Sequence, residues 1–172
     1  MAALLACALL AGCATRIDTS QRNTDPPQIR LGSYSRVLTA PLVLHPKVEV
    51  ERESEAVQRI EKGLAKCLSD TLGAMPLGGT APASPALLVT PEIVEMKKVS
   101  VGMRLLAGPF AGSSAILLRL TFRDTGRDEV IASPVFFARG NAIGGSYSAG
   151  ATDNRMLTRI VTLACRYMQQ HR

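Results

Sequence analysis

The sequence predicts an α+β fold: a mostly antiparallel four-stranded sheet with two helices packed on one face, in the order β-α-β-β-β-α. Two observations point to the helices, because residues 54–72 and 153–168 repeat apolar side chains every three or four positions. A third points to the sheet, because residues 115–123 alternate between two sets of side chains and lead into a Thr-Gly turn. Further runs of strand-forming residues complete the sheet.

The first half of the domain is expected to hold one strand and one helix. Residues 36–44 form the strand, and Pro41 within it favours a bulge or an edge position. The helix runs from Ser54 to Leu72, followed by Gly73, a residue type that commonly follows a helix. Residues 73–85 are rich in Gly, Pro, Ser and Thr without periodicity, which predicts a long loop.

The second half is expected to hold three strands before the second helix. Residues 87–101 form a strand with a break at Pro91. Residues 115–123 and 130–139 then form a hairpin around the turn Thr125-Gly126-Arg127-Asp128.

The register of this hairpin follows from matching its apolar faces. A turn centred between Gly126 and Arg127 sets Phe122 opposite Ile131, whereas a turn centred on Thr125-Gly126 would set Phe122 opposite Glu129. We therefore expect the first register, which also pairs Leu118 with Val135 and Ile116 with Phe137. The opposite face of the hairpin then carries Ala115, Leu117, Arg119, Phe136 and Ala138.

The first thirteen residues have the pattern of a bacterial lipoprotein signal. They form an uncharged apolar run that ends in Leu10-Ala11-Gly12-Cys13, and polar sequence follows immediately. The run is too short for a membrane-spanning helix, which needs roughly 20 residues. We expect cleavage between Gly12 and Cys13, and modification of the Cys13 thiol by diacylglycerol and by acyl chains such as palmitate. The alternatives are a plain secretory signal or an ordinary buried helix start.

This signal predicts a cellular location and a domain organisation. Residues 1–12 are the signal peptide, residues 13–35 a lipidated and flexible tether, and residues 36–172 a single α+β domain. No Lys or Arg precedes Arg16, although signal peptides begin with basic residues, so we expect the start codon to lie upstream. The residue after the lipidated cysteine is Ala14, which in Gram-negative lipoproteins implies sorting to the outer membrane. The domain then faces the periplasm.

Composition limits the partners. The formal net charge is +6, and every charged residue lies after Cys13, so the mature chain keeps this charge. Its bases are scattered, and the chain has no Trp, four Phe and three Tyr. Aromatic side chains interleaved with bases, which stack on nucleotides, are therefore missing, and no nucleic-acid partner is expected. Attraction to anionic lipid headgroups or lipopolysaccharide, and a solvated surface without a specific anionic partner, are the remaining interpretations.

Two cysteines remain after processing. Cys67 and Cys165 fall on the apolar sides of the two predicted helices, and two thiols in an oxidising periplasm can pair. A disulfide and two buried free thiols are both compatible with this placement. Their spacing fits no zinc motif, and His45 and His171 are the only histidines, so neither a metal site nor a cofactor is expected.

The glycine-rich segment 140–150 lies between a strand and a helix, where phosphate loops and nucleophile elbows occur. It lacks the Gly-Lys-Ser/Thr ending of a P-loop, and Ser146 stands where an elbow around Ser148 would need glycine. A catalytic triad would also need one of the two histidines, one beside Pro46 and the other next to the last residue. We therefore expect a flexible loop and no enzyme, with anion binding at the helix start and a serine hydrolase as the alternatives.

Three motifs resemble a family of uncharacterised Gram-negative lipoproteins over residues 36–170. They are Leu87-Leu88-Val89-Thr90-Pro91-Glu92-Ile93-Val94, Gly108-Pro109-Phe110-Ala111-Gly112-Ser113-Ser114, and the Thr125-Gly126 hairpin. In that family a glycine-containing turn precedes a long strand, and a Gly-rich loop precedes the last helix. The resemblance implies an envelope lipoprotein without catalytic residues. The element order is also similar to that of curli-type secretion lipoproteins, as an analogy of arrangement.

These observations favour a lipid-anchored protein-interaction or assembly module that binds an envelope protein or a second copy of itself. The expected interaction surface is the sheet face with Leu117, Arg119 and Phe136. Coverage of that face by the N-terminal tether is the other interpretation. The alternative function is binding of an anionic lipid or glycan of the envelope through Arg119, Arg123, Arg139 and the glycine loop.

Overall fold

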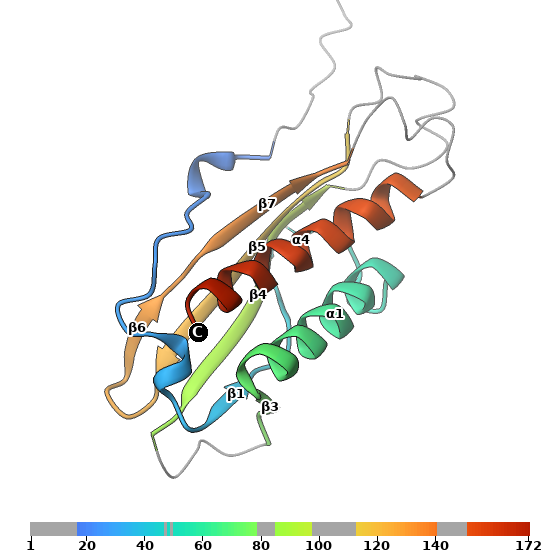
Figure 1. Cartoon of the computed structure of the whole chain (residues 1–172). Coiled ribbons are helices and arrows are strands. Elements are labelled where there is room, and N and C mark those ends of the chain that lie inside the picture. The colour runs from blue at the N-terminus through green and yellow to red at the C-terminus, as the bar shows by residue number, and fades with distance from the viewer. Residues whose placement is uncertain (1–16, 47, 49, 79–84, 98–112, 141–150) are drawn as a thin grey trace, which may run out of the picture.

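A computed structural model describes residues 17–46, 48, 50–78, 85–97, 113–140 and 151–172, with side chains from residue 154 onward in the last stretch. The fold is α+β, as predicted. Two long helices, α1 (Glu55–Leu72) and α4 (Ala151–Gln170), lie side by side across one face of a twisted sheet, as Figure 1 shows. Two short 3-10 turns, η1 (Thr19–Gln21) and η2 (Leu31–Ser33), precede the first strand.

The sheet has seven strands and mixed directions, so the prediction of a mostly antiparallel four-stranded sheet is only partly correct. Strand β4 pairs in parallel with β1 and β2, and β1 pairs in parallel with β3, whereas β5 is antiparallel to β4, β6 and β7. The path across the sheet is β3-β1-β4-β5-β6. The strands are β1 (Val37–Thr39), β2 (Val43–Leu44), β3 (Met75–Pro76), β4 (Leu87–Lys97), β5 (Ala115–Asp124), β6 (Glu129–Ala132) and β7 (Val135–Arg139).

Parallel pairing follows from the helix between the strands. The chain leaves β2, crosses the sheet through α1 and returns as β4, and such a crossover brings the next strand back in the same direction. Prolines explain why the strands are short or interrupted. Pro41 separates β1 from β2, so the single strand expected over residues 36–44 is two short strands, and Pro134 separates β6 from β7.

Pro91 does not break β4, contrary to expectation. Strand β4 continues through Pro91, which pairs with Leu120 of β5. On the other side of β4, Val89 accepts from Ala40 and Ile93 accepts from His45, so the neighbouring strand is interrupted opposite Pro91. A central strand tolerates a proline there because no carbonyl of that neighbour is waiting for the missing N–H.

Helix α1 forms where its sequence predicts it. The Ser54 side chain accepts from the Val57 amide at 3.4 Å, and Gly73 closes the helix with a left-handed φ of 64°. The predicted apolar face is the buried one, including Ile60, Leu64 and Leu68. Helix α4 extends slightly beyond the predicted range at both ends and buries Leu157, Ile160, Ala164 and Met168, among others.

The hairpin register is correct at the turn and wrong beyond it. Arg123 pairs with Val130, as the predicted turn requires, but Phe122 pairs with Ala132 and Leu118 with Phe136. The reason is a bulge between Phe122 and Arg123 that shifts every later pair by one residue. Because side chains alternate along a strand, this shift exchanges the two faces of β7 relative to the prediction.

Two apolar clusters result, one on each face of the sheet. The main core lies between the sheet and the two helices and includes Phe122, Phe136 and Leu31. The second cluster lies on the opposite face and consists of Val94, Leu117 and Val135, with Ile17 and Phe137 packed against it. In the described part of the chain, no helix combines the length and apolar character needed to cross a bilayer.

Candidate interaction site

The predicted interaction surface is not an exposed patch. Leu117 is completely buried against Val94 and Val135, and Ile17 packs on this cluster. Arg119 is partly buried, with Nη1 2.9 Å from Glu92 Oε2 and Nη2 3.2 Å from Gln21 Oε1. Of the two interpretations offered by the sequence, coverage by the N-terminal residues is therefore the one that the structure has.

Phe136 lies on the other face, so its placement beside Leu117 was wrong. Its side chain is in the main core, edge-on to Tyr167 of α4 with ring centroids 5.7 Å apart. The bulge in the hairpin is the physical reason, because it turns Phe136 toward the helices and Val135 and Phe137 away from them.

Residues 17–35, the N-terminal arm, pack along the outer side of β7 and β6, where Figure 1 shows them in blue. Asn23 exchanges backbone hydrogen bonds with Val135 at 3.3 and 2.6 Å, and the Gln28 amide donates to Ile131 at 3.0 Å. Leu31 is completely buried in the main core. This part of the expected flexible tether thus belongs to the packed domain, and the expected domain boundary at residue 36 lies inside it.

The arm is also fastened to the end of α4. The Leu31 amide donates to the His171 carbonyl at 2.9 Å, and the Tyr167 hydroxyl donates to the Asp25 carbonyl at 2.8 Å. Burial, with a smaller contribution from Asp25, raises the pKa of Tyr167 to about 12. The His171 ring packs against the Tyr167 ring at a tilt of 57°, with ring centroids 4.5 Å apart.

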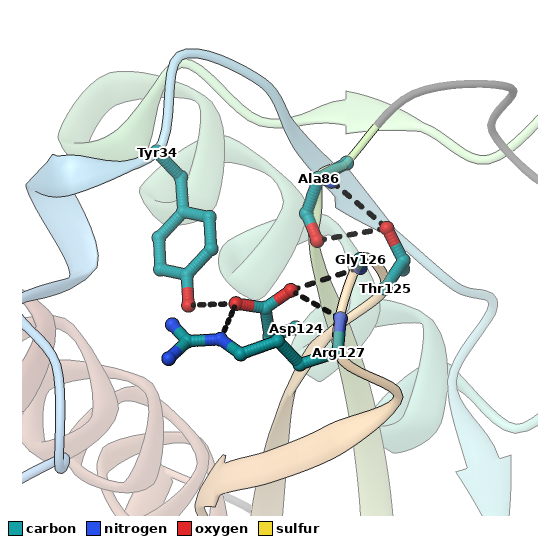
Figure 2. A network of polar contacts seen from close by, with 6 residues as sticks. All are labelled: Tyr34, Ala86, Asp124, Thr125, Gly126 and Arg127. Atoms are coloured by element: carbon teal, nitrogen blue, oxygen red, sulfur yellow. Dashed lines mark hydrogen bonds and ion pairs between the residues drawn. The ribbon is translucent and has the colours of Figure 1, made fainter.

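A polar network around Asp124 joins the arm to the hairpin (Figure 2). Asp124 Oδ1 accepts from the amides of Gly126 and Arg127 at 2.8 and 3.1 Å. Its Oδ2 accepts from the Tyr34 hydroxyl and from Arg127 Nε, both at 2.9 Å. The pKa of Asp124 is lowered from its ordinary value of 3.8 to about 2, mainly by the hydrogen bond from the Arg127 amide. Burial and the adjacent carboxylate raise the pKa of Tyr34.

The Thr-Gly pair of the hairpin has a structural purpose. The Ala86 amide donates to Thr125 Oγ1 at 2.8 Å, and the Ala86 carbonyl accepts from the Thr125 hydroxyl at 3.1 Å (Figure 2). The same carbonyl also accepts from the Thr125 amide at 2.9 Å. A side chain at Gly126 would place its Cβ 2.9 Å from the Pro85 Cβ, so a larger residue does not fit without movement. The motif that carries the family resemblance therefore ties the hairpin to the start of β4.

Cys67 of α1 and Cys165 of α4 form a disulfide, with Cα atoms 5.9 Å apart. The bond links the two helices directly, between residues 98 positions apart in the sequence.

The other side of the sheet is open. We call β2, β3 and the cleft beside them the open edge. Met75 in β3 is 53% exposed and Val43 in β2 is 42% exposed. A largely apolar cleft of about 250 Å³ lies next to them, between α1 and the sheet. It is lined by residues that include Pro41, Leu42, Leu64, Leu68, Leu77 and Pro91, with Glu61 as its charged member.

The remaining predicted residues divide into three groups. Arg123 is paired with Asp128 at 2.6 Å, whereas Arg139 is exposed at the end of β7. Gly12, Cys13, Ser146 and Ser148 lie outside the described residues, as does the glycine-rich segment from residue 141. Among the described residues, no group of three His, Cys, Asp or Glu side chains could hold a metal ion.

No protein-family model and no curated protein matches the sequence. The fold is similar to PelC from Paraburkholderia phytofirmans, solved as a dodecamer in two crystal forms, with TM-scores of 0.57 and 0.54. Both comparisons give 14% identity over 84% of this chain, and cover 95% and 92% of the PelC chain. A weaker similarity is to lipoprotein GNA1162 from Neisseria meningitidis, with a TM-score of 0.42, 11% identity, and coverage of 76% and 96%. The similarity to PelC shows that the two chains share a fold.

Sequence reasoning missed the packed arm and the open edge. The arm offered a weak signal, because Ile17, Ile29 and Leu31 are apolar residues in a polar stretch but have no regular spacing. The open edge depends on β3, a two-residue strand inside a segment whose composition is that of a loop.

Proposed function

We propose that this chain is a lipid-anchored envelope lipoprotein that acts as an assembly module, without catalytic activity, and packs against further copies of itself through the open edge. The single observation that carries the proposal is the difference between the two sides of the sheet. The chain covers β7 with its own arm, whereas Val43, Met75 and the adjacent apolar cleft are left exposed by the residues that the structure describes.

An uncovered strand edge beside apolar side chains favours association with another chain. Natural sheets usually protect their edges with charges, prolines or covering segments, because unpaired backbone groups otherwise recruit new strands. Here the edge strand β3 is short and ends in Pro76, so it limits strand addition, but the apolar cleft offers side-chain packing. PelC, which shares the fold, is a dodecamer, and this supports self-association as the form that assembly takes.

The anchor belongs to the same proposal. Cys13 is the residue we propose to be lipidated, after cleavage behind Gly12, and Ile17 lies four residues further on and packs against the sheet. Four residues span at most about 14 Å, so the anchor would hold the domain close to the membrane surface. We assign this membrane to the outer membrane and the domain to its periplasmic side, on the signal sequence and Ala14.

Charged substitutions at the open edge test the proposal. The mature full-length protein in detergent is compared with Val43→Lys/Met75→Lys by light scattering coupled to size exclusion. We expect an oligomer for the wild type and a monomer for the variant, because a lysine desolvated in an interface is unfavourable. Val130→Lys is the matched control, since Val130 is 38% exposed on β6 at the other side of the sheet. A wild type that is monomeric, or a control that dissociates equally, would refute the proposal.

The alternative function is binding of an anionic envelope component, and two of the three arginines predicted for it are not available. Arg119 is paired with Glu92 and Arg123 with Asp128, so neither presents a free charge. Such a function would need a different basic surface, and helix α4 provides one.

A further inference from the structure

The outer face of α4 carries a row of three exposed arginines: Arg155, Arg159 and Arg166. Spacings of four and seven residues place them on one side of the helix, over roughly 16 Å of its length. Together with Thr158, Thr162 and Leu163, among others, they line a shallow hollow of about 500 Å³. We call this surface the arginine row. Val161, which faces Gly63 of α1, marks the opposite side of the helix.

These arginines have no partner in the described part of the protein. None of them makes an ion pair or a side-chain hydrogen bond with another described residue. The sequence offers little else nearby, because Asp153 is the sole carboxylate of α4 and the adjoining segment 141–150 contains none. Three positive charges are therefore left for solvent or for a ligand.

Helix α1 differs from α4, because two of its three bases have an acidic partner. On α1, Arg59 pairs with Glu55 and Lys66 with Asp70, each at 2.8 Å and each four residues apart. On α4 the same spacing joins Arg155 to Arg159, a like-charged pair that disfavours the helix. Arg155 also lies near the start of α4, where the helix dipole is unfavourable to a positive charge. Helix stability thus does not explain the arginine row. Residues that destabilise their own helix without a compensating contact are typical of functional surfaces.

The residue type and the shape indicate the ligand. All three bases are arginines, whose planar guanidinium groups bind carboxylates in a bidentate manner. The exposed charge forms a line, since the adjacent α1 surface neutralises two of its bases, and a line suits a chain-like anion better than a flat bilayer. Protein interfaces depend on a buried apolar centre, but the exposed large apolar residues of the described chain, Val43, Met75 and Val130, all lie elsewhere.

We propose that the arginine row binds an acidic polysaccharide, whose carboxylates lie along α4 from Arg155 to Arg166. The hydroxyls of Thr158 and Thr162 donate to helix carbonyls at 3.0 and 2.9 Å, so their outward lone pairs remain available to sugar hydroxyls. This site is separate from the open edge and does not depend on assembly.

The test measures binding of polygalacturonate to the full-length protein in detergent at 0.15 M salt, by calorimetry. The variant Arg155→Gln/Arg159→Gln/Arg166→Gln is compared with Arg59→Gln/Lys62→Gln/Lys66→Gln, which removes the same charge from α1. We expect the α4 variant to bind about tenfold more weakly or worse, and the α1 variant to bind nearly as well as wild type, because salt screens charges beyond about 8 Å. Equal losses in both variants, or wild-type binding no stronger than to neutral dextran, would overturn the proposal.

Two further measurements distinguish a polysaccharide site from a structural role of the arginines and from a lipid site. Thermal unfolding of the α4 variant should occur at the wild-type temperature or above, since the substitutions relieve repulsion and break no described ion pair; a clear decrease would show that the arginines serve the fold. Phosphatidylglycerol vesicles are the second probe. If they bind in a manner that the α4 variant abolishes while polygalacturonate does not bind, the surface recognises lipid headgroups and the polysaccharide proposal is wrong.

Discussion

The two sides of the sheet are built in opposite ways. The β7 side is closed, because the N-terminal arm adds backbone hydrogen bonds at Asn23 and inserts Leu31 into the main core. On the β2 and β3 side none of the described segments forms such a cover, and Val43 and Met75 are exposed. The side that carries the arm is thus closed by the chain's own residues, and the far side is exposed in the described part of the structure. An arm that packs on one edge fixes which edge can associate.

Removal of the disulfide tests how much the link between the two sides contributes to the free energy of unfolding. Cys67 lies in α1, on the open side, and Cys165 in α4, on the closed side. Replacing both by Ala should lower the free energy of unfolding by about 3 to 4 kcal/mol, because the bond closes a long loop in the unfolded chain. Urea unfolding of the oxidised protein, the reduced protein and the double variant measures this. Identical stability of all three would show that the mature chain does not use the bond.

Leu31 tests the closed side alone. Truncation by Leu31→Ala should destabilise the protein by about 2 to 4 kcal/mol, since Leu31 is completely buried. Hydrogen exchange at the amides of Asn23, Gln28 and Val135, which donate across the contact between arm and sheet, should accelerate as the arm detaches. Val130→Ala, at an exposed position of the neighbouring β6, is the control and should change stability by less than about 0.5 kcal/mol. An equal effect of both would mean that the arm contributes nothing particular.

The pH dependence of stability tests whether the Asp124 network holds the arm in place. The pKa of Asp124 is lowered from 3.8 to about 2, so its stabilising effect is fully present above pH 4. It is lost as the pH falls through 2, where the folded state also becomes protonated. Wild-type thermal stability should therefore fall over this interval more steeply than that of Asp124→Asn. Parallel curves for the two proteins would contradict the assignment.

Tyr34→Phe isolates the contact between arm and hairpin within that network. It removes the hydrogen bond to Asp124 but keeps the ring, and should cost about 1 kcal/mol. Urea unfolding at pH 7 gives the difference, and no difference would mean that the Tyr34–Asp124 hydrogen bond does not help to hold the arm.

The sequence was sufficient wherever local rules decide the structure. Helix α1 could be predicted with its ends, because Ser54 and Gly73 are capping residues of standard type and the apolar spacing is regular. The hairpin faces could not, because a single bulge beside Arg123 reverses them and no apolar pattern signals it. The closed edge required knowing that Leu31 packs between helix and sheet, a contact between distant segments. The arginine row was missed, because the bases look scattered along the chain and the sequence does not show which of them lack a partner.

The smallest effect on stability is expected at the open edge, in contrast to the large effect expected at Leu31 on the closed side. Met75→Gln changes a side chain that is 53% exposed and lies outside the monomer's core, so the unfolding free energy should move by less than about 0.5 kcal/mol. The experiment is run at a concentration where the chain is monomeric. At higher concentration the same substitution should lower the thermal unfolding temperature relative to wild type, because oligomerisation stabilises the folded state by mass action. An effect that is independent of concentration would mean that Met75 serves the monomer, and that the open edge is not where copies meet.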